Sequence, residues 1–334
     1  MLQYFKNSFI VAGIGLILAF LIGGIEAAWI ALVLSILEIS LSFDNAVVNA
    51  QVLKDMDAVW RQRFITWGMA IAVFGMRMAF PLVIVSVALG INPYSSFMLA
   101  VNNPDQYAHA LESVHSSVMG FGATFLTLVA LKFFIDHDKE THWFKPIEER
   151  FVKLGKIESI QSAITLIIVY VVYKMIGSIH NDAEATSFLI ASVFGLVTYI
   201  LVDGLESVIG STDGEISGAV VKSGLASFLY LEVLDSSFSF DGVLGALALT
   251  NNIFIIMIGL GVGALFVRSL TLLMVDKGTV DEFIYLEHGA FYAILGLAII
   301  MFTNTVYEIP ESITGLIGAA FIGASIFTSI KHKV

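Results

Sequence analysis

Two long apolar segments of the chain contain acidic side chains, and these residues have the types and spacing that could do chemistry. The set consists of Glu38, Asp44 and Asn45 in residues 27–52, and of Glu232, Asp235 and Asp241 in residues 218–249. An acidic side chain at the centre of a bilayer costs about 2.5–3.5 kcal/mol on insertion scales. We therefore expect the five carboxylates to line a cavity, to pair with cations or to be protonated, which makes them candidates for function.

The donor atoms in these segments are carboxylate, amide and hydroxyl oxygens, which are hard ligands that suit Mn²⁺, Mg²⁺ or Ca²⁺. The chain has no cysteine, so thiolate sites for Cu(I) or Zn²⁺ are excluded, and neither segment contains histidine. The six residues are thus predicted to bind a divalent metal ion. The alternative is that the acids only pair with Arg77 and Arg268, although two arginines leave carboxylates over.

The spacing of the acids does not direct them to one point on a regular helix. Glu38 and Asp44 are six residues apart, or about 240° round a helix, and Glu232 and Asp241 are nine apart, or about 180°. Serine-rich stretches lie between them at residues 40–43 and 236–239, and serine hydroxyls compete for backbone hydrogen bonds. We therefore predict that both helices are bent or unwound at these stretches.

The composition indicates a helical membrane protein. Hydrophobic residues make up 57% of the 334 residues and charged residues 13%, about half the charged share of a soluble protein. A spanning helix needs about 20 apolar residues. On this basis we predict an all-α, polytopic bundle of about ten spans, at residues 8–25, 27–52, 64–89, 114–135, 159–177, 187–209, 218–249, 252–275, 285–304 and 311–330.

The basic residues predict the orientation of these spans. If the N-terminus is cytoplasmic and the spans alternate, 13 of the 17 basic residues fall on the inner side and the outer loops contain none. Both termini are therefore expected in the cytoplasm, with the chain in a bacterial inner membrane. The inner segment 136–158 has apolar residues at helical spacing and is predicted to form an amphipathic helix on the membrane surface, with a regulatory or partner-binding role as the alternative.

The order of motifs suggests an internal repeat. Gly68 and Arg77 are nine residues apart in the third span, and Gly259 and Arg268 are nine apart in the eighth. The second span has Leu-Glu followed by Ser-Phe-Asp, ending at Asp44, and the seventh span has the same two motifs in the same order, ending at Asp241. We predict two five-helix repeats, residues 1–180 and 181–334, which must be inverted because five is odd. Inverted repeats are common in secondary transporters, where the site lies near the midplane.

The two acidic motifs resemble those of the TerC family of integral membrane proteins, part of the LysE-type transporter grouping. Its first motif is an acid followed six residues later by Asp-Asn, as in Glu38 and Asp44-Asn45, and a downstream arginine matches Arg77. Its second is Glu with Asp three and nine residues on, as at Glu232. The resemblance covers about residues 40–280. It implies a divalent-metal exporter, with Mn²⁺ as the favoured ion, and a link to metal-ion and tellurium-oxyanion resistance in some members.

We therefore expect a secondary transporter that exports a divalent cation in exchange for protons, and not an enzyme. The alternatives are a membrane scaffold or assembly factor, and a metal-dependent membrane enzyme. Arg77 and Arg268 are expected to balance the charge of the site or to gate it. Residues near span ends that could belong to the ion path are Glu26, Glu206, Glu112 and His115.

The expected partners are the metal ion and the lipid bilayer. A net charge of −11 argues against a nucleic-acid partner, which would require a basic surface. The sequence leaves open whether copies of the chain associate as a homo-oligomer.

Overall fold

The structure, a computed structural model, describes residues 2–68, 70–136, 139, 141–157, 159–210, 216–307 and 309–333. Every regular element within these ranges is helical, which confirms the all-α prediction. The side chains of Glu206 and Asp241, both predicted to be functional, lie outside the described part of the chain.

Seven of the described helices are long and apolar enough to cross a membrane. They are α1 (Leu2–Leu41), α7 (His115–Ile135), α9 (Ile160–Ile179), α10 (Asp182–Gly210), α12 (Ile253–Lys277), α14 (Leu286–Asn304) and α15 (Glu311–Lys333). An eighth span is formed if the bent pair Ala58–Gly68 and Val73–Leu89 counts as one. These helices identify an integral membrane protein, whereas the count of ten spans and the sidedness of the termini stay predictions.

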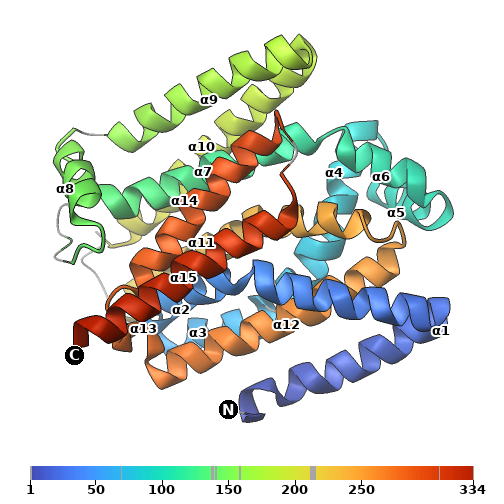
Figure 1. The fold of residues 1–334 in the computed structure, drawn as a ribbon, viewed down its shortest axis with the longest axis horizontal. Helices are drawn as coiled ribbons and strands as arrows, with labels where there is room; N and C mark the ends of the chain where they lie inside the picture. The colour runs from blue at the N-terminus through green and yellow to red at the C-terminus, as the bar shows by residue number, and fades with distance from the viewer. Residues whose placement is uncertain are drawn as a thin grey trace. The chain divides into compact units, whose positions relative to one another are not determined.

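Helix α1 doubles back at a glycine pair close to the boundary predicted at residue 26. Gly24 has a φ of 71°, which residues with a side chain rarely adopt, and Gly23 is also non-helical. Ser8 at one end of α1 donates a hydrogen bond to the Leu265 carbonyl (3.0 Å). Glu38 at the other end packs against Gly263. Both halves of α1 therefore lie along α12 (Figure 1).

The chain divides into two compact units, and the first comprises Met1–His115 with Gly214–Lys277. Its further helices are α2 (Phe43–Asp55), α3 (Ala58–Arg63), α4 (Phe80–Leu89), α5 (Pro93–Asn102), α6 (Pro104–Glu112) and α11 (Ile216–Leu247), and its π-helices are η1 (Phe64–Gly68) and η2 (Ile71–Ala79). Small residues of α1, such as Ala31, let α12 approach closely, and Ser35 donates a hydrogen bond to the Gly259 carbonyl across this contact (2.9 Å).

The second unit comprises Ser116–Asp213 with Gly278–Val334. It contains α7, α9, α10, α14 and α15, with the short helices α8 (Lys145–Leu154) and α13 (Thr279–Glu282). Helix α9 packs on α10, and α14 packs on α15 (Figure 1). Each compact unit thus combines a part of the predicted repeat 1–180 with a part of 181–334, and the repeats themselves stay a prediction.

The described part of segment 136–158 contains the helix α8 (Lys145–Leu154), and one of the acids of this helix lies inside the protein. Glu148 is fully buried and accepts hydrogen bonds from Lys139 (2.9 Å), from the Phe144 backbone N–H (3.1 Å) and from the Tyr292 hydroxyl of α14 (3.2 Å). Burial alone would raise the pKa of Glu148, but the hydrogen bonds from Lys139 and Phe144 outweigh it, and the pKa is lowered. An acid that the sequence places on a solvated face therefore anchors the segment to α14.

Candidate functional site

The first acidic motif lies at a break between two helices, as predicted for residues 40–43. Helix α1 ends at Leu41 and α2 begins at Phe43, with Ser42 between them at φ −101° and ψ 18°. The backbone N–H of Ser42 still bonds to the Glu38 carbonyl (3.0 Å), so the break is a one-residue distortion. The Ser42 hydroxyl donates to Glu38 Oε1 (2.9 Å), which joins the break to the acid.

The unwinding predicted for residues 236–239 is absent. Helix α11 runs through this stretch without interruption. The hydroxyls of Ser236 and Ser237 donate to the Val233 carbonyl (2.6 and 3.0 Å), one turn back along the same helix. Hydroxyls that bond back to the preceding turn can bend a helix, but the backbone here stays helical.

Glu38 forms a buried ion pair with Arg77 of η2, and the two side chains also share a hydrogen bond. Both side chains are more than nine-tenths buried. Wide π-helical turns such as η2 often occur at functional sites. With Ser42 on the same carboxylate, Glu38 has two partners that hold it in place.

The second arginine, Arg268 of α12, is held more loosely. Its Nη1 lies 3.9 Å from Asp235 Oδ2, and its guanidinium stacks on the ring of Phe64, with Cζ 3.6 Å from the ring centre. Asp235 itself accepts a hydrogen bond from Asn49 Nδ2 (3.0 Å). The second acidic motif is therefore connected to α2 as well as to α12.

Glu232 is buried, and neither of its carboxylate oxygens has a hydrogen-bond partner in the described part of the chain. The backbone of η1 passes close by at Gly68. A Cβ atom at this position would lie 2.6 Å from Glu232 Oε1 and 2.7 Å from Arg268 Nη2. Glycine at residue 68 therefore makes room for both head groups.

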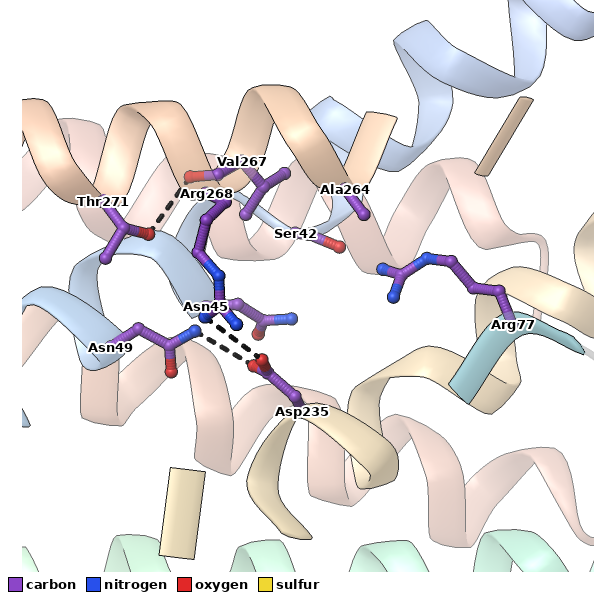
Figure 2. Close-up of a pocket in the computed structure, with 9 residues that line it drawn as sticks. All are labelled: Ser42, Asn45, Asn49, Arg77, Asp235, Ala264, Val267, Arg268 and Thr271. Carbon is purple, nitrogen blue, oxygen red and sulfur yellow. Dashed lines mark hydrogen bonds and ion pairs between the residues drawn. The ribbon is translucent and has the colours of Figure 1, made fainter. Parts of the chain in front are cut away.

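A cavity of about 30 Å³ lies among these groups, large enough for a bound ion or water. It is lined by Ser42, Asn45, Asn49, Arg77, Asp235, Ala264, Val267, Arg268 and Thr271. Figure 2 shows Arg77 and Arg268 entering the cavity from different helices, with Asp235 and Asn49 opposite Arg268. All of these residues belong to the first compact unit.

The structure brings together only part of the predicted ligand set. Asn45 and Asp235 line the cavity, while Glu38 adjoins it through Arg77. Asp44 is buried, accepts the backbone N–H of Asn45 (3.0 Å) and does not line the cavity. Within the described ranges, no three acids or histidines are grouped closely enough to hold a metal ion. Arg77 lies against Glu38, and Arg268 lies near Asp235.

Asn49 and Thr271 line the cavity but were not among the predicted ligands. A sequence signal for Asn49 exists, because it lies four residues after Asn45 and so shares its helix face. No such signal marks Thr271, whose hydroxyl donates to the Val267 carbonyl of its own helix (3.0 Å).

The predicted path residues lie apart from the cavity. Glu26 is exposed two residues after the glycine kink of α1, and Glu112 is exposed and pairs with His109 (3.3 Å). His115 begins α7 and is partly buried. None of these three residues lines the cavity. Their role in an ion path, and that of Glu206, stays a prediction.

Comparison with known proteins places the chain in a family. Residues 43–333 match the profile of the family described as "Protein of unknown function (DUF475)". The chain is a DUF475 protein. The matched range of this DUF475 chain includes Asp44, Arg77, Asp235 and Arg268, and it begins just after Glu38. No curated protein and no solved structure matches the chain, so the resemblance to the TerC family stays a prediction.

Proposed function

We propose that this DUF475 protein is a secondary transporter that exports a divalent metal cation, with Mn²⁺ as the favoured ion. The observation that supports this is an excess of buried carboxylates over buried cations. Among the described side chains of the first compact unit, Glu38, Asp44 and Glu232 are buried and Asp235 is partly buried. The buried cations described in the same unit are two arginines, Arg77 and Arg268. A divalent cation would neutralise that excess, and buried charges are costly when they are left unpaired.

Arg77 and Arg268 act as internal counter-ions in this proposal. Each faces a carboxylate that the metal would otherwise bind. A guanidinium stays charged at all physiological pH values, so it compensates the acids whenever the substrate is absent. The same contacts also favour the alternative function, a membrane scaffold, in which the ion pairs serve only to hold the helices together.

Export requires an energy source. Moving two charges outward against a membrane potential costs about 4.6 kcal/mol per 100 mV. We propose that exchange for protons supplies this energy. A metal-dependent membrane enzyme, in which a metal ion and water hydrolyse a bond, stays a further alternative.

The test uses bacterial cells that lack a manganese exporter of their own and are loaded with Mn²⁺. Cells that produce the wild-type chain are expected to contain less manganese, measured by mass spectrometry, than cells that produce Asp44→Asn. The control Glu149→Gln, at an exposed position of α8, is expected to match the wild type. Equal manganese contents in wild-type and Asp44→Asn cells, at equal amounts of protein in the membrane, would contradict export and favour the scaffold.

A further inference from the structure

The two buried arginines occupy equivalent positions in sequence, but their surroundings differ. Arg77 shares a hydrogen bond and an ion pair with Glu38, and the Ser42 hydroxyl donates to the same carboxylate oxygen, Oε1. Arg268 makes no hydrogen bond to any group that the structure describes, and its nearest carboxylate oxygen is 3.9 Å away. A separation of 3.9 Å exceeds hydrogen-bond range. Arg77 is therefore fixed, whereas Arg268 is free to move.

The ring of Phe64 keeps Arg268 in place without directional bonds. The guanidinium carbon lies 3.6 Å from the ring centre, so the planar group stacks on the face of a fully buried ring. Arginine is well suited to such stacking, because its charge is delocalised and only weakly hydrated. A stacked group can slide along a ring while it keeps most of this attraction.

Arg268 also lies beside two acids: it forms a long ion pair with Asp235 and is hydrogen-bonded to neither acid in the described ranges. Asp235 Oδ2 is 3.9 Å from Nη1, and Gly68 leaves room for both Glu232 Oε1 and Arg268 Nη2. Arg268 Nη2 and both oxygens of Glu232 are buried without a hydrogen-bond partner in the described ranges. A cation that could bond to both oxygens would satisfy these acids better than the guanidinium does.

We propose that Arg268 is a tethered substitute for the transported cation: it faces Asp235 and Glu232 in the empty site and moves along Phe64 when a divalent cation binds them. Arg77 stays paired with Glu38 throughout. This inference rests on the proposed transport function and adds a competition between substrate and side chain at one site. The consequence is that part of the negative charge of the empty site stays compensated, which favours the return of the protein to its starting conformation without a bound metal.

The test measures Mn²⁺ binding by calorimetry and Mn²⁺ export from liposomes with the same purified, full-length protein. In Arg268→Ala the competitor is gone, so Mn²⁺ is expected to bind about ten-fold tighter while export falls about ten-fold or more. Guanidinium ions added to the buffer are expected to reverse both changes. A residue with only a structural role would weaken binding and export together.

A second variant tests the same contact from the side of the ring. Phe64→Leu removes the ring that holds Arg268 beside the acids in the empty site, so Mn²⁺ is expected to bind more tightly, as in Arg268→Ala. The matched control is Phe228→Leu, because Phe228 packs edge-on against Phe64 but has no guanidinium on its ring. The comparison of Phe64→Leu with Phe228→Leu also tests the inference if Arg268→Ala does not fold.

The outcomes separate this inference from the proposed function. Weaker Mn²⁺ binding in Arg268→Ala, or Phe64→Leu binding as tightly as Phe228→Leu, would overturn the inference while wild-type export still supports transport. Absence of Mn²⁺ binding and export in well-folded wild-type protein would overturn the proposed function, and the inference with it.

Discussion

Asn49 shows how one side chain can position an acid that belongs to another helix. Its Nδ2 donates to Asp235 Oδ1 (3.0 Å), and its side chain is buried against the cavity. A carboxylate only accepts hydrogen bonds, so the amide nitrogen must face Asp235. Asn49 therefore determines which way the Asp235 carboxylate points.

Replacement of Asn49 by leucine, which has a similar shape, is predicted to weaken Mn²⁺ binding about 10- to 100-fold. Outer partners that orient a metal ligand typically contribute this much. Calorimetry on purified protein measures the effect. The control is Thr271→Val, which also removes a polar group from the cavity wall, but one whose hydrogen bond stays within its own helix. Equal affinities in the two variants would show that Asn49 does not orient Asp235.

At the residue scale, the sequence predicts which acids and arginines are buried better than it predicts which of them contact each other. Acids and arginines within apolar segments are recognisable because their burial is costly. Which acid faces which arginine depends on helix rotation and close packing, as at Gly68, and sequence spacing does not contain that information. Asp235 of α11 and Arg268 of α12, for example, face each other across two consecutive helices.

The contact between α1 and α12 depends on glycine at residue 263. A Cβ atom there would lie 2.5 Å from Glu38 Cβ and 2.9 Å from the Ser35 carbonyl. No atom within 4 Å would meet a Cβ at Gly13, which lies in the other half of α1. The two glycines therefore form a matched pair for testing close packing beside the site.

Gly263→Ala is predicted to lower the free energy of unfolding by about 1–3 kcal/mol, the usual cost of overpacking, because α12 must move away from Glu38. Gly13→Ala is predicted to leave it unchanged or to raise it slightly. Thermal unfolding in detergent compares the two variants with the wild type. If both variants melt at the same temperature, α1 and α12 do not pack as described.

The anchor of α8 leads to a prediction about pH. The pKa of Glu148 is lowered in the folded protein from the ordinary glutamate value of 4.5. Its ion pair therefore stabilises the anchored segment fully at pH values above 4.5. That stabilisation is lost as the pH falls through the lowered pKa. Besides Lys139 and Tyr292, His142 and His288 face Glu148, at 3.4 and 3.5 Å from Oε2.

The protection of residues 143–154 against hydrogen exchange, relative to the intrinsic rate at each pH, is therefore predicted to be high at neutral pH and to fall below about pH 4.5. Glu148→Gln leaves Lys139 without its carboxylate, at a cost of about 3–5 kcal/mol, so exchange should be fast at every pH. Glu149→Gln, an exposed neighbour, should behave as the wild type. Slow exchange in Glu148→Gln at neutral pH would mean that other contacts anchor the segment.

At the element scale, the same reasoning succeeds once and fails once. Serine between the acids predicts the break at Ser42, where the hydroxyl bonds to Glu38, and predicts a break in α11 that is absent. The difference is the partner that each hydroxyl finds, a side chain in one case and a backbone carbonyl in the other. Neighbouring helices decide this choice, and a local pattern does not reveal them.

At the scale of the whole molecule, composition alone predicts a helical membrane protein, because apolar runs of this length have few other structures. The two compact units could not be predicted, since each joins two segments that are separated in the chain. Hydropathy identifies helices one at a time and does not show which of them pack together.

The orientation is testable because the chain has no cysteine. Single cysteines at Lys6 and Lys331 are predicted to resist a membrane-impermeant maleimide in intact cells, since both termini are expected in the cytoplasm. Cysteines at Asn102 and Asn181, in expected outer loops, should react. Labelling at only one terminus would show an odd number of spans and would contradict the predicted topology.

The most direct test of divalent-cation export is Mn²⁺ flux in liposomes that contain the purified protein and a pH-sensitive dye. Wild-type protein is compared with Asp44→Asn and Asp241→Asn, with Mg²⁺, Ca²⁺ and Zn²⁺ as competitors. We predict Mn²⁺ flux with opposing proton movement in the wild type, and loss of both in the two variants. Absence of any divalent-cation flux in well-folded wild-type protein would contradict the transport function and favour a scaffold.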